Sequence, residues 1–302
     1  MKYYFIVNPV AGKGDGEKTI IQQLSNNDEY LKNPDNFIIV KTSEAGQATS
    51  LVKDICEENR EDIIIFACGG DGTCFEVLNG IVGYDNVRMG IIPVGSCNDF
   101  LKTFPECDFL NINKQITSDF VNVDLIKANG EYVLNVTNFG FDARANRDQI
   151  KYRSKFKTVK KAYNYALFRN IISPKLGDKV EVYVDDKKIF SGKMLLSSIA
   201  NAKYYGGGYK CAPLADYSDG LLEICIVKKV SIITFARLVK YYKLGQHLEN
   251  PKLRKFVTYL RGKKIIIKPV KELVGCFDGE TRVSRLFELE VIHNKIKFIV
   301  PR

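Results

Sequence analysis

The sequence contains no apolar run long enough to cross a bilayer, for which a helix needs about 20 apolar residues. The apolar stretch at residues 3–7 is also too short for the core of a secretory signal peptide. Eight cysteines are present, but none has Cys-x-x-Cys spacing, so neither a disulfide framework nor a zinc site is predicted. The two histidines, His247 and His293, are too isolated to suggest a histidine-based site. These absences predict a cytoplasmic protein with reduced, packed thiols.

Composition adds two positive indications. The chain has 302 residues, of which 45% are hydrophobic and 26% charged, as is typical of a globular protein with one large or two modest domains. Its formal net charge is +10. A basic surface attracts nucleic acid, anionic membranes and phosphorylated ligands alike. The charge therefore indicates an anionic partner without selecting one.

Strand and helix patterns alternate over the first part of the chain. The expected strands are residues 3–7, 37–41, 63–67 and 89–93, and the expected helices are residues 17–31, 48–58 and a segment that contains Phe75. This alternation predicts a doubly wound parallel sheet with helices on both faces. Ligands of such folds gather at the carboxyl ends of the strands, where residues 8–12, 42, 69–73 and 95–98 fall.

The later part of the chain has the pattern of antiparallel strands. Asn129-Gly130 is a strong hairpin signal between strands expected at residues 121–127 and 132–137. Further strands are expected at residues 180–184, 189–196, 221–227 and 264–268, the last after a turn at Arg261-Gly262, with one helix near residues 232–244. We therefore predict two domains, residues 1–127 and residues 128–302.

Residues 68–80 carry the most informative motif, Cys-Gly-Gly-Asp-Gly-Thr-Cys-Phe-Glu-Val-Leu-Asn-Gly. Gly69 and Gly70 follow an expected buried strand and let the backbone approach a ligand closely, because no Cβ intervenes. The helix behind them presents unpaired N–H groups and a positive dipole end, which favour phosphate. Asp71 and Thr73 add a carboxylate and a hydroxyl suited to a magnesium phosphate. The motif predicts a nucleotide-phosphate site.

Residues 12–16, Gly-Lys-Gly-Asp-Gly, do not complete either common nucleotide fingerprint. A Walker A motif would need a glycine directly before Lys18-Thr19, and a GxGxxG pattern would need glycine in place of Glu17. We interpret the segment as a glycine-rich turn after the first strand, whose amides remain able to contact a nucleotide.

Three segments in this order resemble a known family. They are residues 8–12 (Asn-Pro-Val-Ala-Gly), residues 69–73 with Glu76, and residues 93–100 (Pro-Val-Gly-Ser-Cys-Asn-Asp-Phe). Together they are similar to the catalytic domain of diacylglycerol kinases, especially the soluble bacterial lipid-kinase branch. Pro213, Asp216, residues 219–222 and residues 278–280 agree with that branch. One departure is Cys97, which stands where glycine is common. The resemblance implies an α/β fold with an NAD kinase-like parallel sheet and a C-terminal, mainly antiparallel β-sandwich domain.

The same resemblance implies ATP and Mg²⁺ as cofactors, with the nucleotide between the two lobes and Asp71 near the metal-bound phosphates. The residues that it implies around ATP are Asn8, Pro9, Val10, Ala11, Gly12, Thr42, Gly69, Gly70, Asp71, Gly72, Thr73, Glu76, Ser96 and Asn98. A second, structural Mg²⁺ is implied at Asp216, Asp219 and the carbonyl oxygen of Leu221, because oxygen ligands at short spacing suit a hard cation. Without the resemblance, the two aspartates fit solvated turn positions nearly as well.

The segment Asp278-Gly279-Glu280 is open to two interpretations. Asp-Gly is a common choice for a β-turn, and sequence alone favours that structural role. The resemblance implies instead that Asp278 or Glu280 accepts the proton of a lipid hydroxyl as it attacks the γ-phosphate. The sequence does not separate the two carboxylates.

Residues 144–175 are strongly basic and contain one acidic residue, Asp148. The basic residues include Arg147, Lys151, Arg153, Lys155, Lys157, Lys160, Lys161 and Arg169, with aromatic residues interleaved. Such a run usually marks a solvated helix face. In an enzyme that must reach a lipid headgroup, it also suits an anionic membrane surface. No nucleic-acid-binding signature is present, so nucleic acid is not expected as a partner.

These observations predict an ATP-dependent lipid kinase with diacylglycerol as its expected substrate, cytoplasmic and peripherally attached to the membrane. One alternative is a kinase of the NAD kinase type, which shares the motif at residues 69–73 but is disfavoured by residues 93–100. The other is a non-catalytic nucleotide-binding regulator at the membrane, disfavoured because Asp71, Asp278 and Glu280 are all present. The oligomeric state stays open, with a homodimer among the alternatives.

Overall fold

The computed structural model of the chain describes residues 1–12, 14–95, 97–156, 158–173 and 176–302, and the chain divides into two compact units. Unit 1 consists of Met1–Leu125 and His293–Arg302, and unit 2 consists of Ile126–Ile292. Residues 293–302 therefore belong with unit 1 in the structure. The boundary predicted from the sequence, after residue 127, places them in the second domain. The strands β5 (Phe120–Ala128) and β15 (Phe287–Ile299) each have residues in both units.

Unit 1 is built on a parallel sheet. Its strands are β1 (Lys2–Val7), β2 (Phe37–Lys41), β3 (Ile63–Cys68), β4 (Val87–Ile92) and the last part of β15, in the spatial order β15-β4-β3-β1-β2. Because these strands are parallel, their carboxyl ends meet at one edge. The alternating strand and helix pattern of the sequence predicted this sheet, and the prediction is confirmed.

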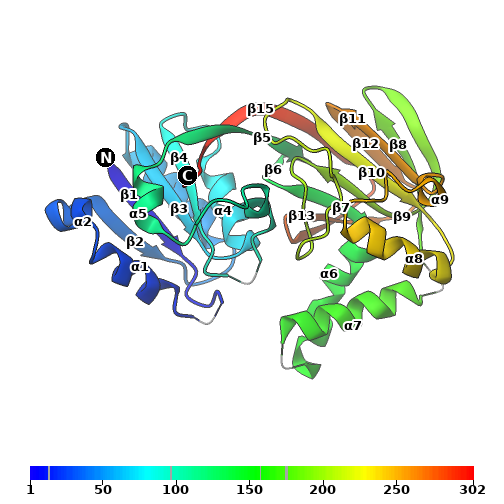
Figure 1. Cartoon of the computed structure of the whole chain (residues 1–302), viewed down its shortest axis with the longest axis horizontal. Coiled ribbons are helices and arrows are strands. Elements are labelled where there is room, and N and C mark those ends of the chain that lie inside the picture. Colours follow the sequence, from blue (N-terminus) through cyan, green and yellow to red (C-terminus); the bar gives the residue numbers. More distant parts are fainter. Residues whose placement is uncertain (13, 96, 157, 174–175) are drawn as a thin grey trace. The chain divides into compact units, whose positions relative to one another are not determined.

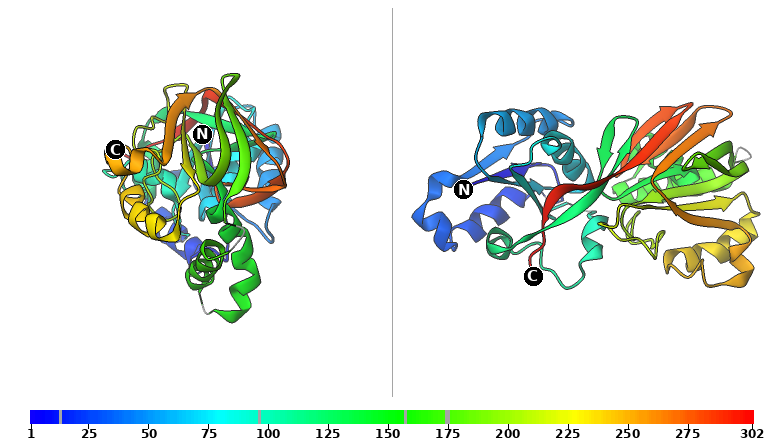
Figure 2. Two further views of the ribbon diagram at one scale, coloured as in Figure 1. Left: turned by 90° about the vertical axis from the view of Figure 1, so that its right-hand side faces the viewer. Right: turned by 90° about the horizontal axis from the view of Figure 1, so that it is seen from above.

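The helices of unit 1 are α1 (Gly16–Leu24), α2 (Asp28–Lys32), α3 (Gln47–Glu58), α4 (Asp71–Ile81) and α5 (Ile112–Thr117). They lie on both faces of the parallel sheet (Figures 1 and 2). The prediction of one helix over residues 17–31 is wrong, because the chain breaks between α1 and α2. At the break the Asn27 side chain accepts a hydrogen bond from the Tyr30 amide at 2.8 Å and caps α2.

The core of unit 1 follows the two periodicities of its elements. Tyr3, Phe5 and Val7 alternate along β1 and lie in one apolar cluster with Ile20 and Leu24 of α1. All six residues of β3 are buried, as expected for a central strand covered on both faces. Each large apolar side chain buried in this way contributes about 1.5–3 kcal/mol. The packing fixes the strand ends that carry the glycine motifs.

Unit 2 is mainly antiparallel and forms the predicted β-sandwich. Besides parts of β5 and β15, its strands are β6 (Glu131–Val133), β7 (Val136–Gly140), β8 (Asp178–Val184), β9 (Lys187–Ala200), β10 (Leu222–Lys228), β11 (Val257–Gly262), β12 (Lys264–Pro269), β13 (Leu273–Phe277) and β14 (Glu280–Ser284). The long strand β9 pairs with β7, β8 and β10, so it connects much of the unit.

Four helices belong to unit 2: α6 (Phe141–Tyr152), α7 (Val159–Ile171), α8 (Ile232–Lys243) and α9 (Pro251–Arg254), counted over the described residues. Figure 1 draws α6 and α7 in green and α8 in yellow, below the strands of this unit. Single 3₁₀ turns elsewhere in the chain are η1 (Pro34–Asn36), η2 (Asp99–Thr103) and η3 (Arg153–Lys155). Among the described residues, none of the helices is both long and apolar enough to span a membrane.

Two local predictions for unit 2 are wrong. The strand expected at residues 132–137 is split into β6 and β7, because the amides at the break donate to a distant carboxylate instead of a neighbouring strand. The turn expected at Arg261-Gly262 is the end of β11. Gly262 packs within the sheet, where a Cβ would lie 2.2 Å from Cγ1 of Val184. Close packing explains this glycine better than a turn does.

Candidate functional site

Three loops at the carboxyl edge of the unit 1 sheet are joined through their backbones. The Asn8 amide donates to the Cys68 carbonyl at 3.2 Å, which ties the loop after β1 to the end of β3. The Gly69 amide donates to the Ile92 carbonyl at 3.2 Å, and the Gly95 amide donates to the Gly69 carbonyl at 3.1 Å. The described residues of the predicted segments 8–12, 69–73 and 95–98 therefore form one connected surface.

Side chains add to this connection. The Asn8 amide group lies 3.5 Å from the Thr73 hydroxyl, while the Asn8 oxygen accepts from the Val10 amide at 3.1 Å. The Asn98 amide group donates to the Gly69 carbonyl at 3.3 Å. These contacts hold the three loops in register around the start of α4. Ser96, predicted in the same group, lies outside the described residues.

Two glycines are required by the closeness of these loops. A Cβ on Gly12, which has φ of +62°, would lie 2.1 Å from the Val94 carbonyl oxygen. A Cβ on Gly95 would lie 2.4 Å from the Gly70 nitrogen. Real Cβ atoms do not approach so closely, so side chains at these positions would push the loops apart. The glycines keep backbone N–H groups accessible to a ligand.

Helix α4 gives the site its electrostatic character. Gly70 is its N-cap and Asp71 its first residue, so the amides of the first turn, which have no acceptor within the helix, lie beside the glycine loops. The positive end of the helix dipole favours an anion there. Thr73 is buried within that first turn, whereas Asp71 is half-buried and brings a carboxylate. A phosphate that carries a divalent cation suits this combination of amides and a carboxylate better than a bare phosphate does.

Thr42 and Glu76 have structural contacts next to this group. The Thr42 amide donates to the Val7 carbonyl at 3.0 Å, which places the residue at the carboxyl end of β2. The two carboxylate oxygens of Glu76 accept from the Gly46 amide at 2.8 Å and the Ala48 amide at 3.1 Å. Glu76 thus caps the start of α3 and links it to α4. Pro9, Val10 and Ala11 lie in the exposed or half-exposed loop after β1.

The cysteines near this site differ in accessibility. Cys68 is fully buried at the end of β3, and its burial raises the pKa of the thiol well above its ordinary value. Cys74 lies 3.8 Å from the Asn98 side-chain oxygen, and Cys97 is exposed. Each of the eight cysteines is a thiol and forms no disulfide in the described structure. Cys97, which departs from the family pattern, is therefore the thiol of this region that a reagent reaches first.

In unit 2 the Asp278 side chain is committed to the backbone. Oδ2 accepts from the amides of Leu134 at 2.8 Å and Asn135 at 3.1 Å, and Oδ1 accepts from the Val136 amide at 2.9 Å. Asp278 also has φ of +45° and is followed by Gly279 with φ of +101°, so the two residues form the turn between β13 and β14. The turn interpretation of Asp278 is thus the one that its geometry supports.

Glu280 differs from Asp278 in its surroundings. It is exposed at the start of β14, two residues after Asp278. The neighbouring Arg282 is bound by both carboxylate oxygens of Glu131, each at 2.7 Å. These hydrogen bonds to Glu131 chiefly raise the pKa of Arg282, and the charge of Glu280 adds to the effect. Glu280 therefore presents its carboxylate to solvent beside a firmly charged guanidinium.

The turn at residues 278–280 is also held from helix α6. The Asn146 side chain donates to the Gly279 carbonyl oxygen and to the sulfur of Cys276, the latter at 3.2 Å. Sequence reasoning missed Asn146, since nothing in its spacing links it to a segment more than a hundred residues later. Its place on the α6 face toward the turn is fixed by the tertiary fold alone.

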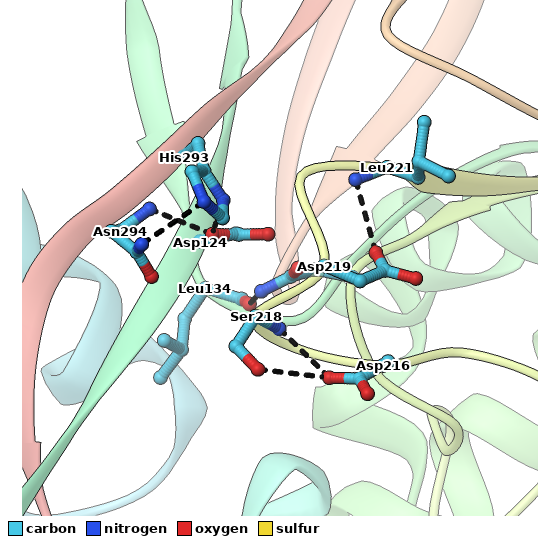
Figure 3. A network of polar contacts seen from close by, with 9 residues as sticks. Asp124, Leu134, Asp216, Ser218, Asp219, Leu221, His293 and Asn294 are labelled. Atoms are coloured by element: carbon cyan, nitrogen blue, oxygen red, sulfur yellow. Dashed lines mark hydrogen bonds and ion pairs between the residues drawn. The ribbon is translucent and has the colours of Figure 1, made fainter.

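At the structural metal site that the sequence implied, the positive charge comes from the guanidinium of Arg261. Figure 3 shows the loop, in which the Asp216 carboxylate accepts from Ser218 and that of Asp219 from the Leu221 amide. The other oxygen of Asp219 pairs with the guanidinium of Arg261. A Mg²⁺ at Asp219 would have to share or displace that guanidinium. Among the described residues, no three His, Cys, Asp or Glu side chains are grouped to hold a metal.

Arg261 also neutralises a second carboxylate, which belongs to no sequence motif. Its Nε lies 2.6 Å from Oε1 of Glu223, a residue of β10 that is 1% exposed. Burial of Glu223 is the largest cause of the raised pKa of its carboxyl group, which the Arg261 charge opposes. Arg261 and Glu223 face each other across paired strands, at Cα partners in the β10–β11 ladder. A pairing of charges on adjacent strands is the signal that would have found them.

Two further buried carboxylates were missed. Asp142, in the first turn of α6, accepts a hydrogen bond from the Tyr205 hydroxyl at 2.8 Å, and burial raises its pKa from 3.8 to about 6. Asp124, on β5, is fully buried and accepts from the His293 ring at 2.8 Å and the Asn294 amide at 2.7 Å (Figure 3). Neither carboxylate belongs to a recognisable motif, so only the fold reveals them.

Comparison with known families accounts for both units. The diacylglycerol kinase catalytic domain matches residues 2–128, and the YegS C-terminal NAD kinase beta sandwich-like domain matches residues 135–300, more than half of the chain. The chain belongs to the diacylglycerol kinase catalytic-domain family. Membership of this family makes the chain a kinase.

Relatives and solved structures agree with this assignment. The diacylglycerol kinase of Bacillus subtilis (strain 168) is 27% identical over 302 residues, which cover 98% of this chain and 95% of that protein. The diacylglycerol kinase of Staphylococcus carnosus (strain TM300) is 29% identical over 243 residues, covering 79% and 76%.

Two solved structures share the fold. A diacylglycerol kinase from Bacillus anthracis str. Sterne has a TM-score of 0.70 at 24% identity and covers 99% of this chain and 96% of its own. An NAD kinase from Archaeoglobus fulgidus in complex with ATP has a TM-score of 0.51 at 11% identity and covers 100% and 94%. At these identities the likeness concerns architecture, and the acceptor of the kinase needs a separate argument.

Proposed function

We propose that this kinase transfers the γ-phosphate of ATP to a lipid hydroxyl, with diacylglycerol as acceptor and phosphatidic acid as product. The observation that carries the proposal is the group of three backbone-linked glycine loops beside the first turn of α4. The names of the relatives from Bacillus subtilis and Staphylococcus carnosus support diacylglycerol as the acceptor.

The loops of unit 1 would hold the nucleotide. Backbone amides at Gly70–Thr73 and the loop at Asn8–Gly12 would bind the phosphates, and the Asn98 side chain would keep the Gly69 carbonyl in place. A Mg²⁺ that accompanies ATP would offset the phosphate charge beside Asp71. The protein's own contribution is to position the phosphates and exclude other geometries.

The two carboxylates of the turn after β13 would have separate roles. We assign the proton-accepting role to Glu280, because its carboxylate is exposed, whereas the oxygens of Asp278 accept three backbone hydrogen bonds. In the transfer, the acceptor oxygen forms a bond to the γ-phosphorus, the bond to the bridging oxygen breaks, and ADP leaves. The hydroxyl proton passes to Glu280. Asp278 is then a positioning residue.

Helices α6 and α7 support a membrane-bound acceptor. Arg144 pairs with Asp178, and Arg147 and Lys151 pair with Asp148, so part of this basic segment is neutralised internally. Four exposed cations make no such pair within the described residues: Arg153, Lys155, Lys161 and Arg169. Lys157 lies outside the described residues. The remaining cations would face the anionic surface of a membrane, at which the protein would be peripherally bound on the cytoplasmic side.

The acceptor is tested with labelled ATP and purified protein. Diacylglycerol in mixed micelles should become labelled and NAD should not, whereas label in NAD alone would make the chain a soluble-substrate kinase. A total lipid extract, analysed by mass spectrometry after reaction, identifies any other acceptor. Binding of ATP without label in any lipid would favour a non-catalytic nucleotide-binding role.

A further inference from the structure

Helix α8 has an unusual solvent face. Its inner face is apolar, and Phe235 and Tyr242 pack against the core cluster of unit 2. On the outer face Ile233 is 69% exposed, and Leu244, just past the helix end, is 54% exposed. Arg237 and Lys240 are exposed between them. The α8 stripe, residues 233, 237, 240 and 244, has the spacing that aligns side chains along one side of a helix.

The charge around this stripe is one-sided. Residues 228–255 contain eight basic residues and one acidic residue, Glu249. The basic residues are Lys228, Lys229, Arg237, Lys240, Lys243, Lys252, Arg254 and Lys255. In the part of the chain that the structure describes, none of the eight forms an ion pair with a carboxylate. Elsewhere lysines do form such pairs, as Lys41 does with Glu17 and Lys188 with Glu181. The positive charge at α8 is therefore uncompensated.

Helix α7 repeats the pattern. Lys161, Tyr165, Phe168 and Ile172 are exposed at the same relative spacing, with Phe168 at 58% and Ile172 at 45%. On their inner faces, Leu167 and Ile171 of α7 pack against the same core cluster as Phe235 and Tyr242 of α8. Both helices thus pack against the same cluster, and Figure 1 draws them in a layer of helices below the strands of unit 2. The two stripes are repeated features of that layer.

We propose that the α8 stripe is a second contact with an anionic membrane, in addition to α7. Ile233 of the stripe and the adjacent Ile232, which is 52% exposed, enter the boundary between headgroups and acyl chains, while Arg237 and Lys240 bind lipid phosphates. Nucleic acid would bind the cations of the stripe but would leave Ile232 and Ile233 exposed to water. Apolar and cationic side chains on one helix face suit a lipid surface. The inference rests on the proposed lipid kinase function only for the biological role of the contact. Binding of α8 to the membrane requires no ATP.

The test is cosedimentation of the full-length protein with vesicles of phosphatidylcholine alone or mixed with phosphatidylglycerol, without ATP. Binding to the mixed vesicles should fall about 30-fold in Arg237→Gln/Lys240→Gln, at about 1 kcal/mol per cation near an anionic surface. Ile232→Ser/Ile233→Ser should lose about tenfold on both vesicle types, because less apolar surface is buried. Arg237→Lys/Lys240→Arg keeps both charges and should bind as the parent does.

Matched controls come from unit 1. Leu31→Ser, at a similarly exposed apolar position, and Lys32→Gln/Lys53→Gln, at two exposed lysines, should leave vesicle binding unchanged. Circular dichroism verifies that each variant is folded. If both α8 variants are folded and bind mixed vesicles as tightly as the parent, the proposal is wrong. The proposal is also wrong if the two α8 variants lose binding to a nucleic-acid oligonucleotide but keep binding to vesicles.

Kinase assays separate this proposal from the proposed function. With a short-chain diacylglycerol dissolved as monomers, the α8 variants should phosphorylate the acceptor at the parental rate. With long-chain diacylglycerol in anionic vesicles, they should be slower in proportion to the lost binding. If the parent phosphorylates no diacylglycerol but α8 still controls vesicle binding, the kinase substrate is wrong and the membrane contact stands.

Discussion

Asp278 and Glu280 lie two residues apart, and the structure predicts that replacing each will affect a different property. The Asp278 carboxylate accepts three amide hydrogen bonds, at 2.8, 2.9 and 3.1 Å, from the break between β6 and β7. A hydrogen bond to a charged group contributes about 1.5–3 kcal/mol when buried. Because Asp278 is half-buried and water can replace part of each bond, we expect Asp278→Ala to lose about 2–4 kcal/mol of unfolding free energy.

The backbone adds a second, separable component. Asp278 has φ of +45°, where an alanine is strained by about 1 kcal/mol and a glycine is not. Asp278→Gly should therefore be more stable than Asp278→Ala by about that amount, although both lose the three hydrogen bonds. Asp278→Asn retains a side-chain oxygen for one amide, so its loss should lie below that of alanine.

Urea unfolding and amide hydrogen exchange measure these changes. The amides of Leu134, Asn135 and Val136 should exchange faster in Asp278→Asn, by up to about 30-fold, since that is the effect of about 2 kcal/mol on local opening. Glu280→Gln should leave unfolding within about 0.5 kcal/mol of the parent and lower phosphoryl transfer by about 10²–10⁴. Glu288→Gln, at an exposed position of β15, is the control for both measurements. Unchanged exchange at residues 134–136 in Asp278→Asn would refute the structural role, and full activity of Glu280→Gln would refute the catalytic one.

Three other predictions follow from contacts described above. Gly95→Ala should abolish ATP binding in equilibrium dialysis, because its Cβ would lie 2.4 Å from the Gly70 nitrogen, and retention of parental affinity would contradict the loop packing. Arg261→Met should lower the thermal midpoint, because the carboxylates of Asp219 and of the buried Glu223 both lose their cation, and an unchanged midpoint would contradict these ion pairs. A partial recovery on addition of Mg²⁺ would show that the loop at Asp219 can take a metal in place of the guanidinium. Asp142→Asn should flatten the pH dependence of stability between about pH 4 and pH 6. The folded pKa of about 6 lies above the unfolded value, so the folded state binds more protons and loses up to about 3 kcal/mol as pH rises through this window.

The parallel sheet and the edge at which its glycine loops meet could be predicted because they depend on local patterns. The apolar run of β3 and the glycines after it specify a buried strand, a tight turn and a helix start without help from distant residues. The break between α1 and α2 was missed because a single cap, Asn27, interrupts an otherwise continuous apolar periodicity. Cap geometry of this kind is a weaker signal than periodicity.

The proposed acceptor site in unit 2 depends on contacts between distant segments, which no local pattern contains. Asp278 accepts hydrogen bonds from residues 134–136, which are 142–144 positions earlier in the sequence. Arg261 pairs with Asp219, which is 42 positions earlier. The sequence named Asp278, Asp219 and Glu280 by resemblance alone. It could not tell that two of these carboxylates already have partners and that the third is exposed.

The division of unit 1 into two stretches of chain has a consequence for how the protein is made. Strand β4 pairs with β15, and Phe298 of β15 is fully buried against Phe100, Phe104 and Phe109. During synthesis these residues emerge only after the whole of unit 2. Until then strand β4 is an open edge of the parallel sheet and the three phenylalanines lack Phe298, a state that is vulnerable to aggregation. A fragment that stops near residue 127 would keep that defect permanently, whereas a construction that joins residues 293–302 directly to the end of unit 1 would repair it.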